Sequence, residues 1–174
     1  MLFAKLFKSL KEIMEIKKLF KKDIKQCMNI YNYYIENTTA TFEEKRLTFF
    51  KFYKRIKKIA KNYPFFVAVE NNKVLGYAYL NSFNERSAYK YTVDLSIYLD
   101  KNCLNKKIGT KLYNIIEETA IKLGYKNIIS LITEENENSK IFHEKMGFSC
   151  VGKLEGVGIK FGKKLSVSYY QKIL

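Results

Sequence analysis

The chain of 174 residues contains one proline, one histidine and three cysteines, and it has no long apolar run. The single proline and the eight glycines exclude collagen-like and low-complexity architectures. The cysteines (Cys27, Cys103 and Cys150) are odd in number and form no CxxC pair, which argues against a disulfide framework and against a structural zinc site. Charged residues interrupt the apolar segments, so no transmembrane helix is predicted. We therefore expect a cytoplasmic protein that binds no metal.

Positive charge is in excess, with 32 lysines and arginines against 17 acidic residues and a formal net charge of +15. Such an excess attracts nucleic acid, anionic membranes or phosphorylated ligands. The lysines are scattered along the whole chain, so they are weak evidence for a nucleic-acid role, and we expect neither nucleic acid nor a membrane as a partner. With 47% hydrophobic residues, a chain of this length is predicted to form one packed domain.

Residues 1–13, MLFAKLFKSLKEI, place apolar residues at helical spacing with lysines between them. The pattern predicts a short basic amphipathic helix. It does not predict a signal peptide, because lysines interrupt the apolar stretch and no small-residue cleavage site follows. We expect this extension to pack on the chain or on a partner subunit and to be dispensable for catalysis, with residues 14–174 forming the domain.

Apolar periodicity predicts alternating helices and strands after residue 14. The expected helices cover residues 21–37, 43–61, 108–123 and 139–146, the last with Asn138 as its N-cap. The expected strands cover residues 14–19, 64–70, 73–80, 91–99, 127–133, 148–154 and 165–173. A tight turn at residues 71–72 makes a hairpin, and a glycine-rich connection joins the last two strands. This order predicts an α/β domain with a mixed sheet.

The stretch IYLDKNCLNKKIGTKL, residues 97–112, reads as a strand, a short polar loop and a helix. Gly109 near the helix start lets the backbone approach a ligand, and free N–H groups at a helix start bind phosphate. The segment contains neither a Walker P-loop nor a dinucleotide fingerprint. On its own, the pattern fits either a phosphate site or an ordinary strand–helix joint.

Five segments together resemble the GNAT N-acetyltransferase family, and within it the branch that includes phosphinothricin and methionine sulfoximine acetyltransferases. They are residues 30–42, 63–80, 86–100, 136–148 and 151–167. The resemblance begins near Met14 and continues toward the C-terminus. It implies a single GNAT-fold domain of the α/β class, with a mixed, mostly antiparallel, splayed sheet and helices on both faces.

The resemblance also implies acetyl-CoA as co-substrate and no metal. The pyrophosphate would lie on backbone N–H groups of Asn105, Lys106, Lys107, Ile108, Gly109 and Thr110. The pantetheine arm would pair with Ile97, Tyr98 and Leu99, with Asn136 contacting it from the opposite strand end and His143 next to the sulfur. Two positions depart from the usual family pattern, since Leu104 and Lys107 replace a polar residue and a glycine.

The resemblance implies direct transfer of the acetyl group to a primary amine. Asp94, where this branch usually has glutamate, would take a proton from the acceptor ammonium. His143 would donate a hydrogen bond to the departing thiolate, and a backbone N–H near Tyr98 would stabilise the oxyanion. From the residues alone, a helix-surface or core position is the less favoured alternative for His143, whereas Asp94 could equally be an ion-pair partner of Arg86 or Lys90.

The expected acceptor is a small amino-acid-like amine, because a polycation would be repelled by this charge. The residues expected to line the acceptor pocket are aromatic or cationic: Tyr34, Phe42, Arg86, Tyr89 and Lys160. Lys164 and Ser166 replace the tryptophan and aspartate common in the closing segment. The alternatives are a catalytically silent CoA-binding or interaction module and an acetyltransferase for an unrelated amine. A homodimer is also possible.

Overall fold

In this computed structural model, residues 14–104 and 106–174 are described, so the helix expected at residues 1–13 lies outside the described residues. The described chain forms one seven-stranded mixed sheet in the order β1-β2-β3-β4-β5-β7-β6. The strands are β1 Glu15–Lys18, β2 Phe65–Glu70, β3 Lys73–Ser82, β4 Thr92–Leu99, β5 Asn127–Thr133, β6 Ser149–Lys160 and β7 Lys163–Ile173. The α-helices are α2 Ile24–Asn37, α3 Phe49–Asn62, α4 Ile108–Lys122 and α5 Glu137–Lys145. The α/β class and the mixed sheet expected from the sequence are confirmed.

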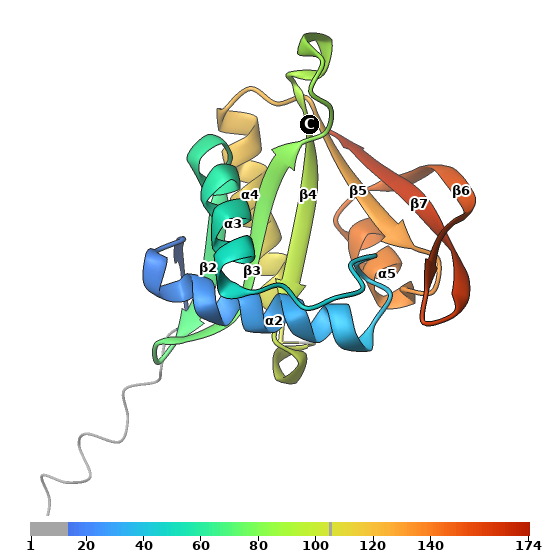
Figure 1. Cartoon of the computed structure of the whole chain (residues 1–174). Coiled ribbons are helices and arrows are strands. Elements are labelled where there is room, and N and C mark those ends of the chain that lie inside the picture. Colours follow the sequence, from blue (N-terminus) through green and yellow to red (C-terminus); the bar gives the residue numbers. More distant parts are fainter. Residues whose placement is uncertain (1–13, 105) are drawn as a thin grey trace, which may run out of the picture.

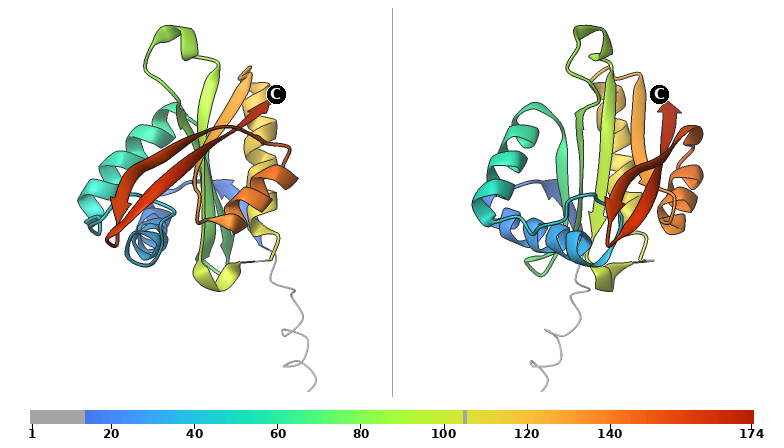
Figure 2. Two further views of the ribbon diagram at one scale, coloured as in Figure 1. Left: turned by 90° about the vertical axis from the view of Figure 1, so that its right-hand side faces the viewer. Right: turned by 45° about the vertical axis from the view of Figure 1, so that its right-hand side comes forward.

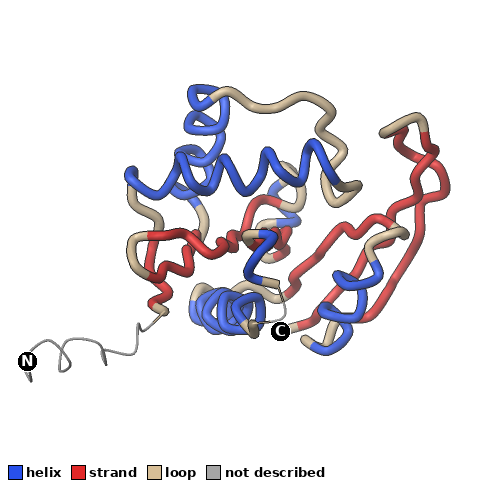
Figure 3. Tube along the Cα trace, turned by 90° about the horizontal axis from the view of Figure 1, so that it is seen from below, coloured by secondary structure: helices blue, strands red, loops and turns tan. Residues whose placement is uncertain are grey.

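The helices lie on both faces of the sheet, α2 and α3 on one and α4 and α5 on the other (Figures 1 and 3). Alternation along each strand sends one set of apolar side chains to each face. Under α4, the core contains Leu80, Val93, Leu95, Leu112 and Ile116. Under α2 and α3, it contains Cys27, Ile35, Phe52, Ile56, Val67 and Tyr77. No helix in the described part of the chain is long and apolar enough to cross a membrane.

Strands β4 and β5 separate after a short parallel pairing. Residues 92–94 of β4 pair with residues 127–129 of β5, whereas β7 pairs with β5 along its whole length on the other edge. Beyond residue 94, the β4 edge that faces β5 is therefore unpaired. The two strands diverge toward the end of the sheet where α4 begins (Figure 1). This gap between the β4 arm and the β5–β7 arm is called the splay below.

Three expectations about element boundaries are wrong. The helix expected from residue 43 begins only at Phe49, because the Thr48 side chain accepts a hydrogen bond from the Lys51 N–H and caps it there. Asn136, not Asn138, is the N-cap of α5, accepting from the Ser139 N–H. The glycine-rich connection is instead part of β6, which absorbs it through register shifts at 150/152 and 154/158.

Close packing of β3 against β4 depends on Gly76. A Cβ built there would lie 2.5 Å from Leu99 Cδ2 and 2.9 Å from the Tyr98 carbonyl oxygen. We expect Gly76→Ala to lower the free energy of unfolding by about 1–3 kcal/mol, since the strands must move apart. Gly152→Ala is the matched control in β6, where a Cβ meets nothing within 4 Å. Urea unfolding of both variants checks this, and equal stability would contradict the packing argument.

Candidate active site

The start of α4 lies at the open end of the splay and is free to bind an anion. Among the described residues no side chain caps this helix, so its first backbone N–H groups are available to a ligand. Lys107, the N-cap residue, has φ 58 and ψ 12, in the left-handed region. A left-handed residue before a helix start turns successive N–H groups toward one point and makes an anion-binding nest. Residues 106–110 therefore form a helix start with a left-handed residue where the phosphate site is expected, and phosphate binding there stays a prediction.

Gly109 contributes through packing inside the domain. A Cβ at Gly109 would lie 3.5 Å from both Leu99 Cδ1 and Phe142 Cε2, which is ordinary contact distance. Its missing side chain thus faces β4 and α5, while its N–H remains at the helix start. An alanine Cβ would fit there, so the packing of α4 against the β4 arm does not itself require glycine.

The β4 arm is anchored from the α2 side by tyrosines. The Tyr34 hydroxyl donates to the Leu99 carbonyl at 2.9 Å, so Tyr34 supports the strand end. The Tyr98 ring packs edge-on against Tyr31, at 5.1 Å, and tilted against Tyr77, at 5.5 Å. Burial raises the pKa of Tyr98 well above its ordinary value, so its phenol stays protonated and the backbone is the part of Tyr98 left for chemistry.

Two buried hydroxyls on β5 have no hydrogen-bond partner within the described ranges. They belong to Ser130, which is 2% exposed, and Thr133, which is 6% exposed. A buried hydroxyl without a partner costs about 1–3 kcal/mol, so such groups commonly serve a ligand. Ser130 and Thr133 are three positions apart, so their side chains lie on opposite faces of β5. Thr133 lies where β5 has separated from β4, and together with the unpaired β4 edge and the uncapped helix start it fits an extended, amide-bearing, phosphate-bearing molecule such as acetyl-CoA. Nothing in the sequence marked these hydroxyls, since both lie in an apolar strand.

Asp94 lies on the same face of β4 as Ser96 and Tyr98. Burial raises the pKa of Asp94 from its ordinary value to about 7. Asp94 forms no ion pair in the described part of the chain. Lys90, one of its two candidate partners, instead places its ammonium 4.9 Å from the Tyr91 ring centroid. The residue is thus a half-buried carboxyl without a structural partner, poised to change protonation near neutral pH.

His143 lies on the α5 face, 7% exposed, with its ring edge-on to Phe142 and Phe148. Its Nδ1 is 2.8 Å from the Ser139 carbonyl oxygen, which can only accept, so Nδ1 carries the proton. Burial lowers the pKa of His143, so the ring is neutral near pH 7. Nε2 is then a hydrogen-bond acceptor. This geometry differs from the expected donation to a thiolate, which would require a second proton on the ring.

The expected acceptor residues fall into two groups. Phe42, after α2, meets the β6–β7 hairpin, where a Cβ on Gly158 would be 2.2 Å from its ring. Lys160 of that hairpin is 1% exposed and donates to the Thr41 carbonyl at 2.6 Å. Arg86 and Tyr89 belong to the β3–β4 connection, at the opposite end of the sheet from the start of α4 (Figure 1). The structure therefore brings Phe42 and Lys160 together, without Arg86 and Tyr89.

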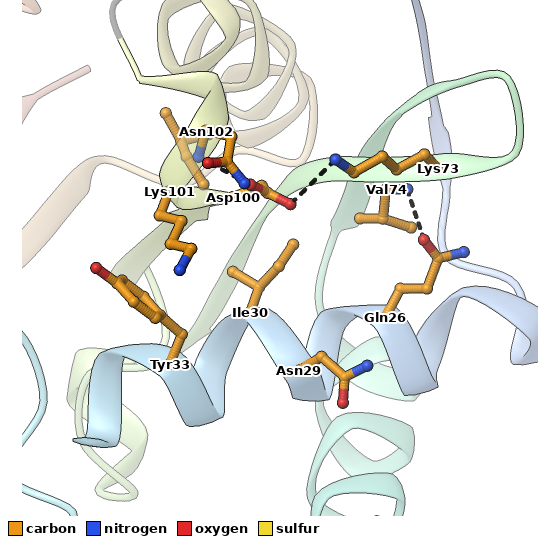
Figure 4. A pocket seen from close by; sticks show the side chains of 10 residues that line it. Gln26, Asn29, Ile30, Tyr33, Lys73, Val74, Asp100, Lys101 and Asn102 are labelled. Carbon is orange, nitrogen blue, oxygen red and sulfur yellow. Dashed lines mark hydrogen bonds and ion pairs between the residues drawn. The ribbon is translucent and has the colours of Figure 1, made fainter. Parts of the chain in front are cut away.

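Asn136 and the polar cavity beside β4 complete the surroundings. The Asn136 side-chain oxygen caps α5, which leaves its NH₂ group for a ligand. A cavity of about 290 Å³ lies between α2, the start of β3 and the turn after β4 (Figure 4). At its rim Lys73 Nζ is 3.6 Å from Asp100 Oδ2. This cavity lies on the α2 side of β4 and contains none of the unpaired hydroxyls.

The acetyltransferase (GNAT) domain family matches residues 16–166, which is most of the chain. The chain belongs to this family. It is an acetyl-CoA-dependent N-acetyltransferase. It is 27% identical over 158 residues to phosphinothricin N-acetyltransferase of Streptomyces viridochromogenes, covering 91% of this chain and 86% of that protein.

Solved structures agree with this assignment. An N-acetyltransferase from Staphylococcus aureus has a TM-score of 0.90 and 33% identity, covering 92% of this chain and 98% of its own. A phosphinothricin acetyltransferase from Sinorhizobium meliloti in complex with acetyl-CoA has a TM-score of 0.89 and 29% identity, covering 92% of this chain and 88% of its own.

The left-handed backbone at Lys107 gives a test of the α4 start. We expect Lys107→Gly to raise the free energy of unfolding by about 1 kcal/mol, because glycine adopts positive φ without a Cβ clash. Lys106→Gly is the control. Calorimetry with CoA should show affinity that is kept or improved. An affinity loss that is larger at low salt would instead show that the Lys107 ammonium touches phosphate.

Proposed function

We propose that the acceptor is the primary amine of a small amino-acid-like molecule, of the phosphinothricin or methionine sulfoximine type. The observation that carries the proposal is Asp94, an unpaired half-buried carboxyl on the splayed strand, with its pKa raised to about 7. It lies on the strand whose open edge leads to the uncapped helix start. Relatives named for these activities support the acceptor class.

Acetyl-CoA fits the groups around the splay, and when bound it supplies an acetyl group activated as a thioester. Backbone N–H groups of residues 106–110 would hold its pyrophosphate, and the open edge at residues 97–99 would pair with its amide-bearing arm. The Asn136 NH₂ group and the Thr133 hydroxyl are available from the opposite arm. A backbone N–H near Tyr98 would stabilise negative charge on the reacting carbonyl oxygen.

Asp94 would accept the proton that the acceptor ammonium must lose before the amine can attack. A base works best when its pKa is near the working pH, and burial brings Asp94 there. His143 has Nε2 as an acceptor in its neutral form, so it would orient a donor near the sulfur. The surroundings thus suit Asp94 to accept a proton and His143 to accept a hydrogen bond.

The acceptor class also follows from charge. A net charge of +15 repels polycations, whereas a small zwitterion carries its own anion. The buried Lys160 ammonium donates to the Thr41 carbonyl and lies 5.0 Å from the Phe161 ring centroid, so it would place positive charge beside the anionic group of the acceptor. Phe42 would form an apolar wall beside it. Arg86 and Tyr89 lie at the other end of the sheet, so they could contact the acceptor only from a second copy of the chain.

The outer edge of the sheet supports a homodimer. Strand β6 has an unpaired edge and exposes five large apolar side chains at and just beyond it, Val151, Leu154, Val157, Ile159 and Phe161. A long apolar edge strand readily pairs with another chain, and a second copy would cover it. The three free cysteines support the cytoplasmic location.

The pH dependence of the rate tests the role of Asp94. Because the base must be ionised, kcat/KM should rise about tenfold per pH unit below a pKa near 7 and level off above it. We expect Asp94→Asn to lower kcat by about 10²–10⁴-fold and to abolish this limb. Glu85→Gln, an exposed residue of the β3–β4 connection, is the control. If kcat/KM of Asp94→Asn still rises with pH in the same range, the titrating group is not Asp94.

A competition between acceptors tests the substrate class. Equimolar methionine sulfoximine, phosphinothricin, spermidine and kanamycin are offered with limiting acetyl-CoA, and products are separated by mass. We expect acetylation of one or both amino-acid analogues and little of the two polycations. Preferential acetylation of a polycation would overturn the charge argument. Binding of CoA with no acetylation of any amine would favour the catalytically silent module.

A further inference from the structure

The segment after α2 spans the mouth of the splay and is fastened to both arms. On the β4 side the anchor lies in α2 just before this segment, where the Tyr34 hydroxyl donates a hydrogen bond to the Leu99 carbonyl oxygen at 2.9 Å. At its far side, Lys160 of the other arm holds the Thr41 carbonyl at 2.6 Å. Figure 2 shows the β6–β7 hairpin reaching across to this connection. Residues 38–43 are called the strap below.

The strap is ordered by its own contacts as well. The Thr38 hydroxyl donates to the Tyr34 carbonyl at 3.0 Å, and the Thr41 hydroxyl shares a 3.0 Å hydrogen bond with the Tyr31 hydroxyl. Glu43, at its end, forms an ion pair with Arg55 of α3 at 2.5 Å. These bonds tie the strap to α2 and α3. The hydrogen bond from Lys160 to Thr41 joins the strap to the opposite arm.

Lys160 has an unusual environment for a lysine. Its side chain is 1% exposed, and none of the ion pairs in the described part of the chain includes it. Burial lowers the pKa of its ammonium, and Glu43 and Glu44 oppose that shift. A buried ammonium without a carboxylate partner is costly, so a site that keeps one retains it for a contact that an apolar side chain cannot make.

Phe42 makes the second contact across the mouth. Its ring lies against the bare backbone of Gly158, where a Cβ would be 2.2 Å from Cε2 and 2.6 Å from Cδ2. The glycine therefore forms a seat for the ring. The two contacts use adjacent residues of the strap, Thr41 and Phe42, and residues two positions apart in the hairpin, Gly158 and Lys160, so they act as one fastening.

We propose that Lys160 is a positioning residue that fastens the strap across the splay and so forms the wall of the acceptor chamber. The inference rests on the proposed function, because it concerns the face from which the amine enters. With the strap fastened, Phe42 borders the chamber, and Lys160 acts on the acceptor through the strap. Loss of the fastening weakens acceptor binding and leaves the proposed acetyl-CoA site at the start of α4 intact.

The test compares Lys160→Met with Lys160→Arg and with Lys163→Met, an exposed lysine of the same hairpin. A hydrogen bond to a charged group contributes enough for KM of the acceptor to rise ~10-fold or more in Lys160→Met. KM of acetyl-CoA should change less than about threefold on the same scale. Lys160→Arg keeps the charge and the donors and should recover part of the loss. Lys163→Met should match the wild type.

A second readout needs no acceptor. Trypsin cleaves after Lys45 and Arg46, two exposed residues just beyond the strap. We expect cleavage there to be ~5-fold faster in Lys160→Met, and in Phe42→Ala if Lys160→Met does not fold, because the lost hydrogen bond no longer opposes opening. Unchanged cleavage in both variants would overturn the fastening.

The two readouts separate the two proposals. If the wild type acetylates no amine, the proposed function fails, and the protease result still decides whether Lys160 fastens the strap. If acceptor KM is unchanged in Lys160→Met while cleavage accelerates, the strap is not the chamber wall and the inference is overturned. Equal rises in the KM of acceptor and of acetyl-CoA would also overturn it, since they indicate general loosening.

Discussion

The short parallel pairing between β4 and β5 is the constraint on which the rest of the structure depends. Only residues 92–94 and 127–129 are paired, so the two strands must part below them. A longer pairing would fill the edge of β4 that is proposed to hold the acetyl-CoA arm. A shorter one would leave the two halves of the sheet with little to join them. The splay, the open helix start and the strap all follow from this pairing.

The same constraint explains where the unfavourable features of the chain are found. A left-handed lysine, two unpaired hydroxyls, an isolated carboxyl and a buried ammonium all lie around the splay. Each lowers stability in the absence of a ligand. Their concentration in one region is typical of a site whose groups are arranged for binding and chemistry.

Much of the architecture could be predicted from the sequence, because periodicity and turn residues act locally. The pair Asn71 and Asn72 adopts φ 50 and φ 61, as a two-residue hairpin turn requires. The charged run at residues 43–46 was misleading, since its side chains suit a helix and the Thr48 cap decides where the helix begins. The glycines of β6 were misleading because bulges allow a strand to contain them. The fastening between Lys160 and Thr41 joins residues 119 positions apart, and no local pattern predicts such a contact.

The tyrosine cluster on the β4 arm has an optical consequence. The chain contains 14 tyrosines and no tryptophan, so its intrinsic ultraviolet emission comes from tyrosine alone. Tyr98 lies on the splayed strand, and its ring contacts Tyr31, Tyr34 and Tyr77. Excitation energy passes readily between phenol rings at such separations. A rearrangement of the splay therefore changes the emission of the whole cluster, and the protein carries a label-free optical reporter of its own active site.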